Sequence, residues 1–181
     1  MFISEKPATI FLPSHKDYYV LHDQDGDVWM FREQLDNWRY PRYTLAGKTL
    51  SRGIGHRASL DCDFMCDSHD NRISVLIEYL VTTKPGKDLD VWMFNQFLHW
   101  LRGIGGSLRF DEVRVNFNPG NTQQIQSFFS QFSFQRRLLP SGIEKIFCPV
   151  ERLHLVVIAD LKELDFQEIV EDWYAAKFGA A

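Results

Sequence analysis

The order of the apolar segments predicts an α+β fold with mixed α/β character: a twisted, mixed, mostly antiparallel sheet flanked by helices. Two apolar-rich runs, 18–23 and 27–33, flank an Asp-Gly pair, which is a strong signal for a β-hairpin. Residues 73–83 (ISVLIEYLVTT) are β-branched and largely apolar, as expected of a buried strand. Residues 91–102 carry apolar side chains at i, i+3, i+4 and i+7 from Phe94, which predicts a helix.

The remaining elements are predicted from the same periodicities. Strands are expected at 8–13, 58–67, 112–117, 136–140 and 152–160, and helices at 122–132 and 164–178. The segment 36–57 is polar, rich in Arg and Tyr and broken by Pro and Gly, so it is expected to be mostly loop. No low-complexity tract or linker divides the chain, and the sequence therefore predicts a single domain over residues 1–181.

Length and composition limit the classes of protein to which this chain can belong. The 181 residues are 45% hydrophobic and 24% charged, which is ordinary for a folded soluble protein. The net charge is −4, and a protein that grips nucleic acid needs a basic surface, so no nucleic-acid partner is expected. No apolar run approaches the roughly 20 residues that cross a bilayer, and no signal peptide is visible. We therefore expect a cytoplasmic protein without a membrane partner.

The tetrapeptide RGIG occurs twice, at 52–55 and 102–105, and looks like part of a glycine-rich phosphate loop. Such a loop works when it follows a strand and opens a helix, because the helix N-terminus then faces the anion. The second copy instead ends the helix predicted at 91–102, where glycine is a common terminator. Because the first copy precedes an alternating, strand-like run, neither copy is predicted to bind phosphate.

Potential metal ligands are present but lack the spacing of a metal site. Cys, His and Asp gather in one stretch: His56, Cys62, Cys66, Asp67 and His69. Cys-x-x-x-Cys without a second ligand pair does not match a zinc site, and three cysteines with no framework spacing do not suggest disulfides. The DQDGD run at 23–27 lacks the glutamate of a calcium loop and fits a hairpin turn better. No metal is expected.

A unit of strand, loop, helix, strand and helix carries a pattern between residues 73 and 140. The strand 73–83 runs into TKPGKDLD, the helix 91–102 follows, and a later segment reads FFSQFSF at 128–134. This unit resembles the central part of the GNAT superfamily of acyl-coenzyme A transferases. In that family a Q/R-x-x-G-x-G/A loop holds pyrophosphate at a helix start, and a later helix carries F-Y-x-x-x-G-F. The resemblance to a divergent GNAT implies transfer of an acyl group from acetyl-coenzyme A, another acyl-coenzyme A or an acyl carrier protein to an amine.

The same resemblance implies the residues of a site. Pantetheine would enter between the strands 73–83 and 112–117, and Glu78 would act as the general base. The residues implied in donor binding are Val81, Thr82, Thr83, Lys84, Gly86, Lys87, Asp88, Leu89, Asn121 and Phe129. Main-chain groups of the first three would pair with pantetheine amides, and N–H groups from Lys84 to Leu89 would hold the pyrophosphate. The acceptor would be a small molecule or a protein amine, and a homodimer is left open.

Departures from the family pattern keep a second function open. Asp88 and Asp90 fall where the family has glycines, and two carboxylates repel a pyrophosphate unless they are well solvated; either could instead cap the helix. Phe129 stands where the family often has tyrosine, so a hydroxyl that protonates the leaving thiolate is missing there, and Ser133 replaces a glycine. Glu78 also fits an ordinary outward-facing strand residue. The alternative function is a catalytically inactive binding or assembly module that acts through a protein partner or an apolar ligand.

Overall fold

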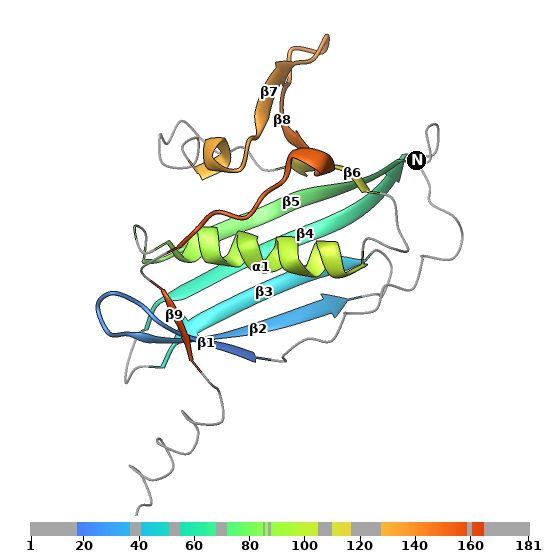
Figure 1. Ribbon diagram of the computed structural model, residues 1–181. Coiled ribbons are helices and arrows are strands. Elements are labelled where there is room, and N and C mark those ends of the chain that lie inside the picture. Colours follow the sequence, from blue (N-terminus) through green and yellow to red (C-terminus); the bar gives the residue numbers. More distant parts are fainter. Residues whose placement is uncertain are drawn as a thin grey trace, which may run out of the picture.

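The fold is that of a computed structural model, which describes residues 18–36, 41–50, 55–67, 72–84, 86, 88–104, 110–116, 128–158 and 161–164. Figure 1 shows a broad, twisted sheet with one long helix lying across it. Several predicted features lie outside the described residues: the strand at 8–13, the helix at 164–178 beyond its first residue, Lys87 and Asn121.

Nine strands form one sheet in the described part of the chain. In chain order they are β1 (Tyr18–His22), β2 (Val28–Asp36), β3 (Arg42–Thr49), β4 (Arg57–Asp67), β5 (Arg72–Thr82), β6 (Phe110–Val115), β7 (Gln135–Leu138), β8 (Glu144–Pro149) and β9 (Lys162–Leu164). Across the sheet their order is β7-β8-β6-β5-β4-β3-β2-β1-β9. β5 and β6 are parallel, and the other described pairs are antiparallel. The mixed, mostly antiparallel α+β sheet predicted from the sequence is therefore confirmed.

The helix α1 (Leu89–Ile104) connects the parallel strands β5 and β6 and packs on one face of the sheet, the inner face. Its aromatic rings meet rings from β2, β3 and β4, at centroid distances of 4.7 Å for Trp92 and Phe31, 5.2 Å for Phe97 and Tyr43, and 5.3 Å for Trp100 and Phe64. The helix predicted at 91–102 is confirmed and is two residues longer at each end. These ring contacts account for much of the high aromatic content, because they fill the layer between helix and sheet.

A second helical element, residues 128–131, packs on the same side of the sheet as α1. The ring centroid of Phe94 in α1 lies 4.5 Å from that of Phe132 and 5.8 Å from that of Phe128. The main-chain N–H of Phe134 donates to the carbonyl of Phe129 at 3.1 Å, which closes the end of this element. The helix predicted at 122–132 is therefore helical over the part that the structure describes.

The opposite face of the sheet, the outer face, carries mostly polar side chains in the described strands. Arg42 of β3 donates to the carboxylate of Asp63 of β4 at 2.6 and 3.1 Å. Two apolar side chains of β5, Tyr79 and Val81, are 52% and 44% exposed on this face. The alternation of apolar inner and polar outer side chains is the pattern of a sheet with one covered face.

The segment 36–57 contains a strand where the sequence predicted mostly loop. β3 pairs with both β2 and β4. Tyr43 and Leu45 are fully buried on the inner face, whereas Ala46, the residue after Leu45, is exposed. The prediction was wrong because the alternating run is short and reaches Gly47, and glycine normally weakens a strand.

Gly47 is required where β3 passes the ring of Phe31. A Cβ at Gly47 would lie 2.4 Å from Cδ1 and Cε1 of Phe31, and that side chain is fully buried. We expect Gly47→Ala to lower the free energy of unfolding by about 1–3 kcal/mol, the usual cost of overpacking. Thermal denaturation measures this, and Ala46→Ser at the exposed neighbouring position is the control, with a change near zero. An unchanged melting temperature in Gly47→Ala would mean that the Phe31 ring has room to move.

Residues 152–158, the described part of the run 152–160, do not form the closing strand that its apolar side chains predicted. Val150–Arg152 form a short 3-10 helix, η1, and residues 153–158 are extended without belonging to a strand. Apart from the exposed Val157, their apolar side chains pack against the core instead, and a periodicity of two cannot distinguish these environments. The strand predicted at 136–140 is present as β7, whereas β8 was not predicted.

Candidate functional site

The strand β5 contains one residue more than the part of β4 opposite it, and that residue is Glu78. Ile77 pairs with Cys62 of β4 and Tyr79 pairs with Asp61, so Glu78 has no partner in β4. A β-bulge of this kind interrupts the alternation of side chains along the strand. Glu78 and Tyr79 therefore both lie on the outer face, and the alternation resumes after them.

A side-chain amide at the end of β6 holds the carboxylate of Glu78. Nδ2 of Asn116 lies 2.8 Å from Oε1 and 2.9 Å from Oε2 of Glu78 and donates to the carboxylate. The main-chain N–H of Asn116 also donates to the carbonyl of Ile77 at 2.9 Å. Sequence reasoning missed Asn116, although the alternating run 112–117 placed it on the face opposite to Val115.

The strands β5 and β6 separate beside Glu78. Their parallel pairing ends with Ile77 opposite Val115, which is also the last residue of β6. β5 continues beyond this point alongside β4 as far as Thr82. The described strands therefore leave an opening between the second half of β5 and the end of β6.

The main chain of β5 presents alternate residues to this opening. The N–H of Thr83 donates to the carbonyl of Arg57 at 2.9 Å, so Thr83 faces β4. Hydrogen-bonding groups alternate between the two edges of a strand, so Val81 also faces β4, whereas Leu80 and Thr82 face the opening. Of the three residues predicted to pair with pantetheine, Thr82 therefore has its main chain toward the opening, and Leu80 was not predicted.

Charged side chains of both signs lie near Glu78 on the outer face, among them Arg42, Asp61 and Asp63. The hydrogen bond to Asp63 raises the pKa of the Arg42 guanidinium, and the charges of Asp61 and Glu78 raise this pKa further. The ion pair with Arg42 neutralises Asp63, whereas Asp61 receives a hydrogen bond from the Ser59 hydroxyl at 3.2 Å. The carboxylates of Asp61 and Glu78 therefore share this face with the Arg42–Asp63 ion pair.

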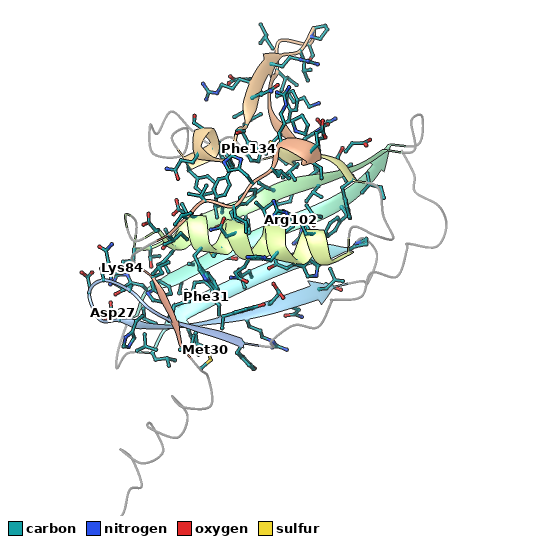
Figure 2. The ribbon with its side chains drawn as sticks, in the orientation of Figure 1. Asp27, Met30, Phe31, Lys84, Arg102 and Phe134 are labelled. Carbon is teal, nitrogen blue, oxygen red and sulfur yellow. The ribbon has the colours of Figure 1, made fainter. Side chains whose placement is uncertain are left out.

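The ammonium of Lys84 is enclosed by three carboxylates of the turn between β1 and β2. Its Nζ lies 2.6 Å from Oδ2 of Asp23 and of Asp27 and 3.0 Å from Oδ2 of Asp25, and Figure 2 shows Lys84 beside Asp27. Nε1 of Trp29 also donates to Asp23 at 3.0 Å. Burial lowers the pKa of Lys84, but the three carboxylates outweigh it and raise this pKa above its ordinary value. The carboxylates of this turn therefore bind the ammonium group of Lys84.

The loop before α1 contains left-handed backbone at two described residues, Gly86 with φ 78° and Asp88 with φ 55°. The carbonyl of Asp88 accepts the N–H of Trp92 at 2.9 Å, the first hydrogen bond of α1. Asp90 in the first turn accepts the N–H of Val91 at 2.9 Å, and burial raises the pKa of the Asp90 carboxyl. Asp90 is therefore an acid of the first turn of α1, as one of the two interpretations predicted, whereas Asp88 contributes its main-chain carbonyl.

Phe129 lies in the core, with 3% of its surface exposed. Its ring centroid is 5.0 Å from those of Phe128 and Phe134. Ser133, at the position of a glycine in the family pattern, has φ 64°. That left-handed conformation explains why glycine suits this position, because glycine adopts it without steric cost.

Apart from Phe129, the predicted donor-binding residues that the structure describes lie in one segment of the chain, between Val81 and Leu89. Val81 to Lys84 lie at the end of β5, and Gly86, Asp88 and Leu89 lead into α1. The N–H of Lys84 donates to the Thr82 hydroxyl at 3.1 Å. Neither RGIG copy opens a described helix: 102–104 form the end of α1, and 52–54 lie outside the described residues.

Cys62 and Cys148 are buried, and burial raises the pKa of both thiols, that of Cys148 to about 11. Among the described residues, no group of three or more His, Cys, Asp or Glu side chains is arranged to hold a metal ion. Within the same ranges, no helix combines the length and apolarity that would cross a membrane.

Comparison with known proteins finds two similar solved structures, while no protein-family model and no curated protein matches the sequence. One is a mutant AtaT toxin bound to the C-terminus of the antitoxin AtaR and acetyl-CoA; it is 13% identical, with a TM-score of 0.42 over 60% of this chain and 68% of that chain. The other is a KacTA–DNA complex with the same identity and TM-score, over 60% and 69%. Likeness at this level carries neither an activity nor a partner to this chain.

Proposed function

We propose that this protein is an acyltransferase that moves an acyl group from acyl-coenzyme A, or from an acyl carrier protein, to an amine. The observation that carries the proposal is the β-bulge, which sets Glu78 beside the point where β5 and β6 separate. A thioester between these strands would bring its carbonyl carbon near a carboxylate that can accept a proton. Positioning of this kind, together with general base catalysis, is what aminolysis of a thioester requires.

The donor is proposed to pair with the main chain of β5 through its pantetheine. Leu80 and Thr82 turn their N–H and C=O groups to the opening, and the amides of pantetheine can add to this edge as a neighbouring strand would. The pyrophosphate would follow Gly86 and Asp88 to the N-terminus of α1, where the helix dipole favours an anion. The acidic side chains at this end oppose the phosphates, so the pantetheine is expected to supply most of the binding.

The proposed reaction forms one carbon–nitrogen bond and breaks one carbon–sulfur bond. A neutral amine attacks the thioester carbonyl, the thiolate leaves, and the proton lost from nitrogen passes to Glu78 directly or through a water. Asn116 acts as a positioning residue, because its amide holds both carboxylate oxygens. Phe129 has no hydroxyl, so the thiolate takes its proton from solvent. The acceptor would reach Glu78 from the outer face, where Asp61 attracts a positively charged amine.

A second candidate is a GNAT-like binding or assembly module without transfer activity. The buried ring of Phe129 and the enclosed ammonium of Lys84 favour it, because neither group is available to a donor. The exposed Tyr79 and Val81 would then contact a protein partner or an apolar ligand. Release of thiol from acyl-coenzyme A in the presence of amines distinguishes the transferase from this module.

Thermal denaturation with acyl-coenzyme A tests the donor. At a concentration 100 times the dissociation constant, the donor stabilises the fold by about 2.7 kcal/mol, which raises the melting temperature by roughly 5–11 °C for a chain of this size. Thr82→Pro removes the N–H that faces the opening and is expected to abolish most of this rise. Thr82→Val loses the same hydroxyl but keeps the N–H, so it is the matched control. No rise at millimolar donor would rule out coenzyme A.

A further inference from the structure

The bulge in β5 turns two apolar side chains from the inner face of the sheet to the outer face. Ile77, just before the bulge, is fully buried on the inner face, and strict alternation would place Tyr79 and Val81 there as well. The extra residue at Glu78 shifts the register with β4, so the residues that follow it change faces. As a result Tyr79 is 52% exposed and Val81 is 44% exposed.

Leu80 and Thr82 take the inner positions instead. Leu80 pairs with Leu60 of β4, and Thr82 pairs with Ala58; both partners are buried. The inner layer thus receives a threonine, while an aromatic ring and a valine remain in solvent. Leaving large apolar side chains in water forgoes the free energy of their burial, so folding alone does not favour this arrangement. A bulge that redirects side chains next to a candidate base is a feature expected of a functional site.

Two carboxylates lie beside Tyr79 on the outer face. Glu78 precedes it in β5, and Asp61 is its partner in β4. The Cβ atoms of directly opposed residues lie about 4.5–5.5 Å apart. The charge of Arg42, which interacts with both carboxylates, is already paired with Asp63 at 2.6 Å. An amine beside the Tyr79 ring therefore meets a carboxylate along β5 and another across β4, and the ring itself attracts a cation.

We propose that Tyr79 and Val81 form the acceptor subsite, and that the acceptor is a small primary amine carrying an aromatic or other apolar group. Its nitrogen would lie at Glu78, and its apolar group would cover the exposed side chains of Tyr79 and Val81. These two residues are about 7 Å apart along one face of the strand, so one small molecule can contact both. This inference depends on the acyltransferase function proposed above and specifies the class of its acceptor.

The subsite is an open surface rather than a closed pocket, which limits the selectivity that it can provide. An apolar pocket separates substrates that differ by one methylene by about 10–200-fold. A ring that covers Tyr79 on an open face is expected to give a preference at the lower end of this range, about tenfold. The aromatic ring provides the contact, so the Tyr79 hydroxyl is not required for it.

The test compares transfer from acetyl-coenzyme A to 2-phenylethylamine, hexylamine and ethanolamine, which are all primary amines and differ in apolar surface. Thiol release gives kcat/KM for each amine in the unaltered protein, which is expected to prefer the two apolar amines over ethanolamine by about tenfold. Tyr79→Ala is expected to lose this preference, whereas Tyr79→Phe keeps the ring and the preference. Tyr18 in β1, four strands from β5 and 37% exposed, is the matched control, and Tyr18→Ala should keep the preference.

The ratio between two amines in one variant does not depend on how much of the protein is active, so a loss of folding cannot imitate the expected result. Equal kcat/KM for the three amines in the unaltered protein would overturn the acceptor subsite and leave the transferase standing. A preference that survives in Tyr79→Ala would overturn it equally. If acetyl-coenzyme A raises the melting temperature but none of the amines releases thiol, the proposed transfer is wrong and the subsite falls with it.

Discussion

Replacing Glu78 with glutamine is expected to lower the rate of acyl transfer by about 10²–10⁴-fold, the usual contribution of a positioned general base. Glutamine keeps the shape of the side chain and can still accept a hydrogen bond from Asn116, so the fold and donor binding should be retained. It cannot take the proton that the amine loses. The measurement is thiol release from acetyl-coenzyme A with a panel of primary amines, compared at equal donor saturation.

Asp61→Asn is the matched control for the Glu78 variant. It removes one negative charge from the same face of the sheet but no proposed proton acceptor. We expect it to raise the Michaelis constant of a cationic amine and to leave the turnover number within a fewfold of its original value. Turnover that survives in Glu78→Gln would show that Glu78 is not the base and would favour a module without transfer chemistry.

Replacing Lys84 with methionine is expected to lower the free energy of unfolding by about 3–5 kcal/mol, because it leaves a buried charge without its partner. The Asp23 carboxylate is fully buried and lies 2.6 Å from the ammonium of Lys84. At about 2–4 °C for each kcal/mol in a chain of this size, the melting temperature should fall by roughly 6–20 °C. Asp25→Asn, at a half-exposed carboxylate of the same turn, is the control, with an expected loss below about 1 kcal/mol.

The pH dependence of Lys84→Met provides a second measurement. Burial raises the pKa of Asp23, but hydrogen bonds from Lys84, Trp29 and the main chain outweigh it and hold this pKa below its ordinary value of 3.8. Ionised Asp23 therefore stabilises the unaltered protein above about pH 4, and this stability is lost as the pH falls further. In the variant the effect of burial on the pKa of Asp23 dominates. Protonation of Asp23 then removes the cost of burying its charge. The difference between the two proteins should narrow from pH 7 toward pH 3; a constant difference would mean that the ion pair is not its cause.

The local patterns of the chain were sufficient to predict the central unit of the fold. The apolar run before Lys84 predicted β5, and the spacing from Phe94 predicted α1, because both patterns depend only on near neighbours in the sequence. The same reasoning failed for β3 and for residues 153–158. Whether a short apolar run joins a sheet depends on which surface is available to it, and that surface comes from distant parts of the chain.

In the candidate site, too, some residues could be predicted from the sequence and others could not. Glu78 could be singled out as a carboxylate in an apolar strand, and the residues after it as a loop before a helix. Asn116 could not be paired with it, because the two residues are 38 positions apart and the crossover between them has an end position that depends on how α1 packs. Lys84 looked like a phosphate ligand, but it meets carboxylates 57 and 61 residues away across the sheet.

The sequence by itself thus determined which segments are strands and helices in the central unit. It also determined that a loop with lysine, glycine and aspartate residues follows β5. Only the tertiary structure decided that Glu78 lies at a bulge on the outer face, that Asn116 holds its carboxylate, and that Asn95 binds the main chain of Val156. The physical reason is that periodicity records whether a side chain faces apolar surroundings. Partner choice for a charge or an amide instead depends on distances between elements, and these are set when the sheet and α1 pack together.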